Sequence, residues 1–417
     1  MKKVSIIYII IVLMVNMYGC TEKKVNDTEE TITLTMWHIW TQKSDNTNGS
    51  IVEGVIEEWN KNNPHIQIKS EIVENEKYKT KIKTAVATNE LPDIFFSWGN
   101  GFSEPFIKSG KILSLDEYID NETKSNVKEN MFDNIEYNGK IYGLPITIST
   151  GTFYYNKKLF EENNLDIPRN YDELLQVIKT FSSMGIIPLG ASGMDNWTGM
   201  MYYDILALQD GGVDGVKEAL EGNNYKLLLK TAYKMRELVQ AGAFSQNNLD
   251  LTRDELEMKF KNGEVAMYYT GNWFIGDLEN SIVKDDIIIG NFPGKDSNSK
   301  QNDFLGGPTD YLMISNDSKY KDEAVEAIEF ICQRVSREFF EFGAGLPAWN
   351  EAKEYEDVNN LNKELEDLTD NSNYFLYWDI YLGEEKGNVH KSLVYDLING
   401  KINPEEFSNI MSNLKRG

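Results

Sequence analysis

The stretch NGKIYGLPITISTGTFYYNKKLF, residues 138–160, decides the fold of this 417-residue chain. It begins as a short apolar strand, passes through Pro145 and a run of small hydroxyl residues, and resumes as a strand at 152–155. A small polar segment between two strands is typical of a chain that steps from one lobe into another. We therefore predict a hinge here between two halves, with a ligand cleft above it.

The chain before this stretch has the pattern of a strand–helix–strand unit. Residues 32–36 alternate apolar side chains with threonines, which predicts a first strand. Apolar residues then recur at helical spacing over 52–59, and a second strand follows at 66–68. Ser50 and Glu53 have the S-x-x-E spacing of a capping box at the start of that helix. This order predicts an α/β fold with a mainly parallel sheet.

The alternation of strands and helices continues along the chain. Further strands are predicted at residues 94–96, 186–189, 265–269, 287–290 and 310–314, and helices at 76–89, 170–181, 225–241 and 322–335.

Length and composition limit the class of protein. A chain of 417 residues exceeds what one hydrophobic core usually supports, so two domain-sized units are expected. The hydrophobic fraction of 41% and the aromatic fraction of 12% fit a folded globular protein. The formal net charge of −24 argues against nucleic acid as a partner, because phosphate binding needs basic patches. It also argues against electrostatic attachment to a membrane surface.

The first residues are predicted to direct export. Lys2 and Lys3 precede a short apolar run, and Gly19 and Cys20 follow it, which resembles a bacterial lipoprotein signal. The resemblance implies cleavage of residues 1–19 and a lipid group on Cys20, which places the protein on the outer face of the cell membrane. An ordinary secretory signal with an incidental cysteine is the alternative. Residues 20–30 are polar and are expected to form a tether.

Four tryptophans lie where predicted strands end in loops rich in Gly, Asn, Asp or Thr: Trp40, Trp98, Trp197 and Trp273. In open α/β sheets, ligands bind at the carboxyl ends of strands. Tryptophan faces stack on the apolar faces of pyranose rings, and neighbouring polar side chains bond the hydroxyls. The pattern therefore favours a site for a neutral sugar. His38, Gln42 and Asn100 lie at the same predicted strand ends.

No catalytic or metal motif accompanies these tryptophans. The sequence contains no G-x-S-x-G, H-E-x-x-H, P-loop or G-x-G-x-x-G pattern, and its three histidines are far apart. We therefore expect no enzymatic activity, no metal and no cofactor. Two alternatives stay open: a secreted carbohydrate-active hydrolase, and a receptor of the same fold for a cationic solute such as a polyamine.

The order of these features resembles the extracellular sugar-binding proteins of ABC importers, the maltose- and oligosaccharide-type solute-binding family. The resemblance spans most of residues 31–345. It is carried by ITLTMWHIW, KTAVATNELPDIFFSWGNGF, FIKSGKILSLDEYI, NGKIYGLPITISTGTFYYNKKLFEENNL, YDELLQVIKTF, FKNGEVAMYYTGNW and FLGGPTDYLMIS, in the family's order.

The resemblance implies a two-lobed periplasmic-binding-protein-like fold of type II, with several hinge crossings. The implied first lobe comprises residues 31–147 and 308–345, and the second comprises 148–307 and 346–417. The hinge segments fall near 145–151, 304–310 and 345–350. A monomer is expected, which binds a sugar or oligosaccharide between its lobes and delivers it to an ABC permease in the membrane.

The resemblance also implies which residues touch the sugar. They are His38, Trp40, Gln42, Trp98, Asn100, Ser149, Asn196, Trp197, Trp273, Asp310 and Trp378. Ser149 stands where maltose-type relatives carry a carboxylate, which argues against maltodextrin itself as the ligand.

Overall fold

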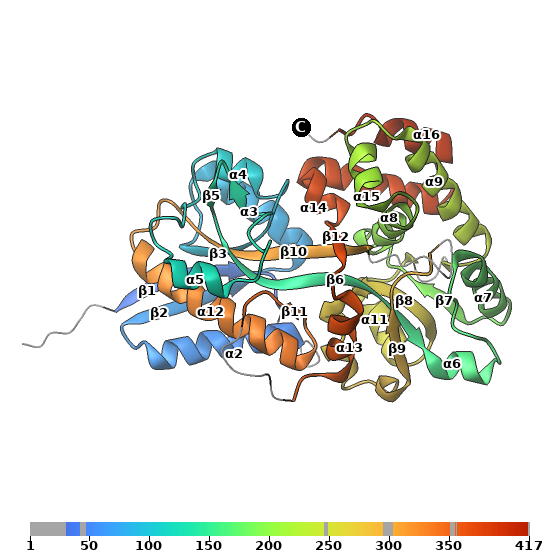
Figure 1. Ribbon diagram of the computed structural model, residues 1–417, viewed down its shortest axis with the longest axis horizontal. Helices are drawn as coiled ribbons and strands as arrows, with labels where there is room; N and C mark the ends of the chain where they lie inside the picture. Colours follow the sequence, from blue (N-terminus) through green and yellow to red (C-terminus); the bar gives the residue numbers. More distant parts are fainter. Residues whose placement is uncertain are drawn as a thin grey trace, which may run out of the picture.

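Two long strands join the halves of the protein. The computed structural model describes residues 31–41, 47–245, 249–294, 303–350, 355 and 357–415. Strands β6 (Leu144–Asn156) and β10 (Asp303–Ile314) run antiparallel across the middle of the molecule (Figure 1). The expected break between two strands is wrong, because β6 is continuous for 13 residues. Its β-branched Thr and Ile residues favour an extended backbone. Neighbouring strands also pair with β6 along its length, β10 with its first part and β8 with its last part.

The first lobe is built on one end of these crossing strands. Its strands follow the order β2-β1-β3-β10-β6, and β1 pairs in parallel with both of its neighbours. The strands are β1 (Ile32–His38), β2 (Ile66–Ile72) and β3 (Ile94–Trp98), and the main helices are α2 (Thr47–Asn62), α3 (Asn75–Thr88) and α12 (Lys321–Phe342). Shorter elements are α4 (Glu104–Lys108), α5 (Asn121–Asn126), β4 (Glu136–Tyr137) and β5 (Lys140–Ile141).

The predicted capping box at the start of α2 does not form. The helix begins at Thr47, so Ser50 lies inside its first turn and not at its cap. Glu53 instead turns to the sheet, where Oε1 lies 2.8 Å from His38 Nε2 and Oε2 accepts a hydrogen bond from Ser70 Oγ at 3.2 Å. The motif fails because the helix already begins before Ser50, which leaves the Glu53 carboxylate to these two sheet residues.

The second lobe is built on the other end of β6. Its sheet follows β6-β8-β7, with β9 also paired to β6. Asn170 caps α7 as predicted, since its side chain accepts a hydrogen bond from the Glu173 amide. The strands are β7 (Ile187–Gly190), β8 (Val265–Gly271) and β9 (Ile287–Gly290). The helices are α6 (Lys157–Glu162), α7 (Tyr171–Ser183), α8 (Trp197–Leu220), α9 (Tyr225–Gln240) and α11 (Arg253–Lys261), with single 3-10 turns at η1 (Asn272–Phe274), η2 (Gly276–Leu278) and η3 (Lys284–Asp286).

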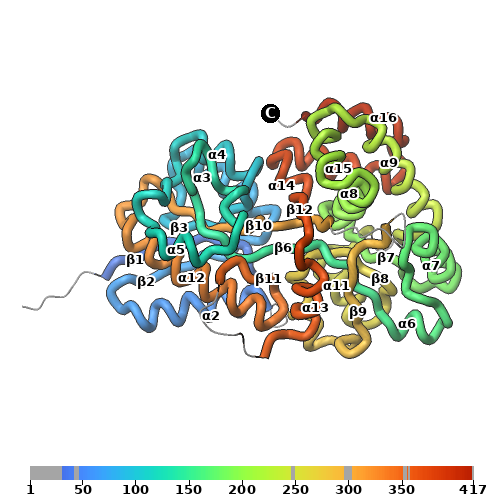
Figure 2. Tube along the Cα trace, in the orientation of Figure 1, coloured from blue at the N-terminus to red at the C-terminus, as the bar shows by residue number. Residues whose placement is uncertain are grey.

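The C-terminal segment runs back past the crossing strands. Strand β11 (Leu346–Pro347) pairs with β6, and β12 (Asn373–Phe375) pairs with β10. Figure 2 shows this segment passing from α13 to the helices that cover the second lobe. The helices of this C-terminal segment are α13 (Asn360–Thr369), α14 (Trp378–Leu382), α15 (Glu384–Ile398) and α16 (Pro404–Met411). Strand β6, strand β10 and the C-terminal segment with β11 and β12 therefore lie together at the junction of the lobes.

The predicted two-lobed α/β fold is confirmed, with one difference in the sheet. We expected mainly parallel strands, whereas β10 runs antiparallel to both β3 and β6, and β6 runs antiparallel to β8. A strand that returns across the junction must reverse direction, which makes the sheet mixed. Cys332 is buried on α12 as a small core thiol. Among the described residues, no helix is both long and apolar enough to cross a membrane.

Candidate functional site

A cleft of about 550 Å³ lies between the two lobes. Its walls come from the loop after β1, the end of β3 and the start of α3 on the first lobe, from the two crossing strands, and from α8, α11, η1 and α14 on the second-lobe side. This volume lies within the range of roughly 300–1,000 Å³ that is typical of small-molecule sites. The cleft is therefore large enough to enclose a ligand that both lobes touch.

The structure brings together the four tryptophans that were predicted from strand ends. Trp40 follows β1 and Trp98 ends β3 on the first lobe, while Trp197 opens α8 and Trp273 lies in η1 on the second lobe. The rings of Trp197 and Trp273 meet edge to face, with centroids 6.0 Å apart. Tyr377 adds a fifth ring, 6.1 Å from that of Trp273. The cleft thus offers aromatic surface from both lobes.

Two of these aromatic side chains carry polar groups that the protein leaves free. The Nε1 of Trp273 and the hydroxyl of Tyr377 are buried and have no hydrogen-bond partner among the residues that the structure describes. Leaving a buried polar group unpaired costs about 1–3 kcal/mol. Both side chains line the cleft, so a polar ligand could supply the missing partners.

The crossing strands form a polar floor. Thr309 Oγ1 donates hydrogen bonds to Asp310 Oδ1 at 2.9 Å and lies 3.0 Å from Ser149 Oγ. Ser149 is buried, and Asp310 is half-buried at the cleft surface. Burial raises the pKa of Asp310 to about 6, against which the Thr309 hydroxyl acts. The floor therefore presents a carboxyl that keeps its proton to a higher pH than an exposed aspartate does.

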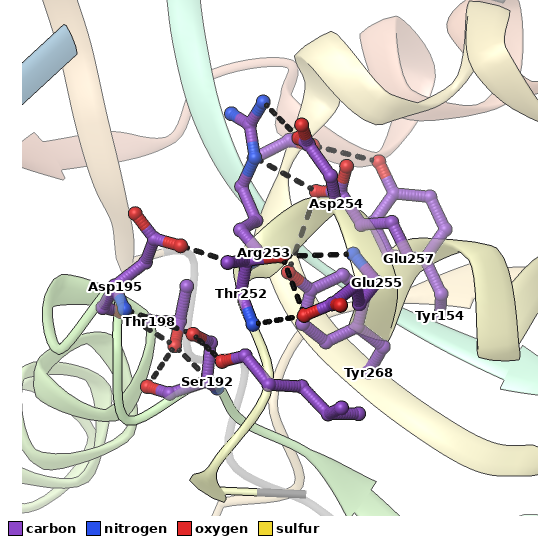
Figure 3. Close-up of polar contacts among 12 residues, drawn as sticks. Tyr154, Ser192, Asp195, Thr198, Thr252, Arg253, Asp254, Glu255, Glu257 and Tyr268 are labelled. Atoms are coloured by element: carbon purple, nitrogen blue, oxygen red, sulfur yellow. Dashed lines mark hydrogen bonds and ion pairs between the residues drawn. The ribbon is translucent and has the colours of Figure 1, made fainter. Parts of the chain in front are cut away.

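A charged cluster lines the second-lobe side of the cleft, and Figure 3 shows its contacts. The Arg253 amide donates to Asp195 Oδ2 at 2.7 Å, and its guanidinium lies 3.1 Å from Asp254 Oδ1 and 3.7 Å from Glu257 Oε1. Burial raises the pKa of Glu257 to about 7, although Arg253 opposes this shift. These contacts fix the guanidinium against the wall, so its charge is largely neutralised by its own neighbours.

Four predicted contact residues lie away from the cleft walls. His38 is fully buried, and its Nε2 lies 2.8 Å from Glu53 Oε1. Its ring packs against that of Trp40, with centroids 5.5 Å apart, so it contacts the tryptophan and not the cleft. Asn100 has a positive φ of 55° and bonds Asn134 and the Gly101 amide, which makes it a turn residue.

The other two belong to the second lobe. Asn196 precedes α8 and makes no side-chain cap to it. Trp378 is fully buried: its ring stacks on His390 with centroids 5.0 Å apart, and its amide donates to Asp204 Oδ2 at 3.1 Å. The preceding residue, Tyr377, faces the cleft instead. Gln42 lies outside the described residues, as do the predicted signal peptide, Cys20 and the tether.

Several cleft residues had no signal in the sequence. Lys79, Arg253, Glu257 and Asp379 line the cleft, but each is a charged residue within a helical segment, where a solvent-exposed position is the usual expectation. Tyr377 stood in an aromatic-rich segment, although nothing in its spacing distinguished it from Trp378. Within the described ranges, no group of three or more His, Cys, Asp or Glu residues could hold a metal ion.

Comparison with known proteins relates this architecture to binding proteins. A family model described as bacterial extracellular solute-binding protein matches residues 43–332. The multiple sugar-binding protein of Streptococcus mutans is 21% identical over 342 residues, which cover 79% of this chain and 78% of that protein.

Two solved structures share the fold. One was determined in work on xylan utilization by the thermophilic bacterium Caldanaerobius polysaccharolyticus; it is 39% identical, with a TM-score of 0.86, and the match covers 92% of this chain and 99% of that chain. The other is a chitin oligosaccharide binding protein at 22% identity, with a TM-score of 0.83 and coverage of 92% and 98%.

Proposed function

The chain belongs to the bacterial extracellular solute-binding proteins, as the resemblance in its sequence indicated, and from this membership we propose that it is the sugar receptor of an ABC importer. The observation that carries the proposal is the cleft wall of four tryptophans, two from each lobe. Flat aromatic faces on opposite walls suit a sugar ring held between them. The donors on Trp273 and Tyr377, which have no partner among the described residues, suit its oxygens.

A xylo-oligosaccharide is the first candidate ligand. The supporting observation is the 39% identity over nearly the whole chain to a protein studied for xylan utilization. An uncharged oligosaccharide also suits a cleft in which Arg253 and Lys79 are already paired with carboxylates. Ser149 offers a hydroxyl where maltose-type receptors carry a carboxylate, which is consistent with a ligand other than maltodextrin.

The proposed mechanism is closure of the two lobes about the crossing strands. Sugar stacks first on one lobe, and the other lobe then closes over it. Because both lobes contribute tryptophans, only the closed form makes the full set of contacts, so the ligand shifts the population towards closure. The permease then recognises the closed form. No covalent step is part of this mechanism.

The proposed location is the outer face of the cell membrane. Family membership supports an extracytoplasmic site of action, and a lipid on Cys20 is proposed to hold the protein there. The proposed partners are the transmembrane subunits of an ABC permease, with the receptor acting as a monomer.

A thermal-shift panel tests the proposed function. The protein without residues 1–20 is mixed with short xylo-oligosaccharides, other oligosaccharides and spermidine. A ligand at about 100 times its Kd should stabilise the protein by roughly 2.7 kcal/mol. Stabilisation by spermidine and by no saccharide would overturn the sugar assignment. Product analysis of the same mixtures addresses the hydrolase alternative, because robust cleavage of an oligosaccharide would overturn the receptor assignment.

A further inference from the structure

Four charged side chains form a network between the lobes, beside the cleft. Lys79 and Glu76 lie on α3 of the first lobe, Asp379 on α14 and Lys391 on α15 of the second. Lys79 Nζ lies 2.9 Å from Glu76 Oε1 and 3.4 Å from Asp379 Oδ2. Lys391 Nζ lies 3.2 Å from Glu76 Oε2 and 4.0 Å from Asp379 Oδ2. Each lysine thus touches a carboxylate of the opposite lobe.

The network is shielded from solvent on most sides. The side chains of Lys391, Lys79 and Asp379 are 3%, 10% and 13% exposed, and only Glu76 reaches the surface. Burial acts against the charged form of Asp379, but Lys79 and Lys391 hold its pKa below the ordinary value. Charges this buried need partners, because an unpaired buried ion is strongly unfavourable. Here each lysine has one carboxylate partner on its own lobe and a second one on the opposite lobe.

Two members of the network reach the ligand cleft and two do not. Lys79 and Asp379 line the cleft, and Lys79 Nζ lies 5.1 Å from the ring centre of Trp98. Glu76 and Lys391 are absent from the cleft lining; they pair with each other, and their remaining ion pairs among the described residues are with Lys79 and Asp379. A substitution at Glu76 or Lys391 can therefore change ligand affinity only through other protein groups.

The backbones of the lobes also meet next to this network. A side chain on Gly101, in the loop after β3, would meet the carbonyl oxygen of Tyr381 at 2.4 Å, and one on Gly383 would meet that of Gly101 at 2.7 Å. Contact this close requires the lobes to be closed together at α14 and α15. The ion network thus lies beside a close backbone contact between the first lobe and the C-terminal helices.

We propose that Glu76 and Lys391 are positioning residues for ligand binding: they form an ion pair between the lobes on closure and hold Lys79, Trp98 and Asp379 in place around the ligand. This inference rests on the proposed function. In the open form, water solvates the separated ions, so the attraction between them favours only the closed form. Affinity for an uncharged sugar therefore depends on two charges that never touch it.

A double-mutant cycle isolates this pair. Glu76→Gln, Lys391→Met and the double variant are titrated with the saccharide that gives the largest thermal shift. The double variant keeps the net charge of the wild type, so long-range repulsion between the acidic lobes is unchanged. Each single variant should weaken binding roughly tenfold, and the double variant should weaken it by at least about threefold less than the product of the two.

Two controls separate positioning from general damage. The cycle on Glu104 and Lys108, an ion pair of 2.7 Å within α4, should show no coupling in ligand affinity. Salt should also distinguish the variants, since screening lengths fall from about 30 Å at 0.01 M to about 3 Å at 1 M. Wild-type affinity should change with salt more than that of the Glu76→Gln/Lys391→Met variant, because only the wild type forms the pair.

A ligand-free measurement separates this inference from the proposed function. Spin labels at the exposed residues Glu117 and Lys179 report the distance between the lobes. At low salt, the wild type should populate the closed distance more than the double variant does. If no saccharide binds, the proposed function fails and this comparison alone decides the inference. Equal closed populations, or a wild type that binds sugar with no coupling between Glu76 and Lys391, would overturn it.

Discussion

Thr309 Oγ1 lies 3.0 Å from Ser149 Oγ, so the two strands that cross between the lobes are joined by their side chains at the floor of the cleft. The same hydroxyl donates to Asp310 at 2.9 Å. The backbones pair here too, with Ser149 opposite Gly307. The ligand surface and the junction of the lobes are thus made from the same residues.

Ser149→Glu tests the role of this floor in ligand choice. The new carboxylate would lie near Asp310 and replace a buried hydroxyl that Thr309 bonds. Affinity for the native saccharide should fall by tenfold or more, about 1.4 kcal/mol, by calorimetric titration. Ser149→Ala is the matched control and should change affinity only about threefold. Unchanged ligand preference in Ser149→Glu would remove Ser149 from the site.

Trp98→Ala and Trp273→Ala test the aromatic walls on the two lobes. Each variant loses a stacking face, and buried aromatic contacts of this kind contribute about 2 kcal/mol or more, roughly 30-fold in Kd. Trp37→Ala is the control, because Trp37 packs against Lys81 and is absent from the cleft lining. Should the control weaken binding as much as the cleft variants, the walls would not be the site.

Asp310→Asn tests the raised pKa at the floor. The pKa is about 6 in the folded protein against an ordinary value of 3.8, so the folded state holds the proton more tightly than the unfolded state. The stability from this proton is therefore complete below about pH 4 and lost as pH rises through about 6. Asp310→Asn should raise Tm relative to wild type near neutral pH and leave it unchanged near pH 4. A constant difference across this range would contradict the assignment.

Gly306→Ala tests the close approach of the crossing strands. Gly306 has a φ of 122°, and an added methyl group would lie 2.0 Å from the Ser149 carbonyl oxygen. Strain and overlap together should lower stability by more than about 2 kcal/mol in denaturant unfolding. Gly54→Ala is the opposite control. Gly54 is exposed within α2 and an added methyl group would meet no other atom, so alanine should raise the free energy of unfolding by about 0.5–1 kcal/mol. An equal change in stability for Gly306→Ala and Gly54→Ala would contradict the close approach of the two crossing strands at Gly306.

Features that depend on chain order could be predicted from the sequence. The tryptophans Trp40, Trp98, Trp197 and Trp273 converge because strand ends meet along one edge of each lobe, a relationship that follows from alternating strands and helices. The two crossings were visible as strand patterns. The continuity of β6 was not, since small hydroxyl residues suit both a turn and a buried strand.

Features that depend on tertiary partners could not be predicted. Glu53 fits a capping box by spacing, but His38 and Ser70 hold its carboxylate on the sheet. Tyr377 and Trp378 are adjacent, and only packing against His390 decides which ring is buried. The sequence around Lys79 predicts an exposed lysine on a helix, and only the packing of α14, with Asp379, against it makes the side chain buried.

Calorimetric titration of the protein without residues 1–20 with a xylo-oligosaccharide tests the central claim most directly. We predict saturable binding to one site, with no hydrolysis of the ligand, and loss of that binding in the Trp98→Ala/Trp273→Ala double variant. Absence of binding to xylo-oligosaccharides and to every other saccharide tried, or equal binding by the double variant, would contradict the claim that this cleft is a sugar site.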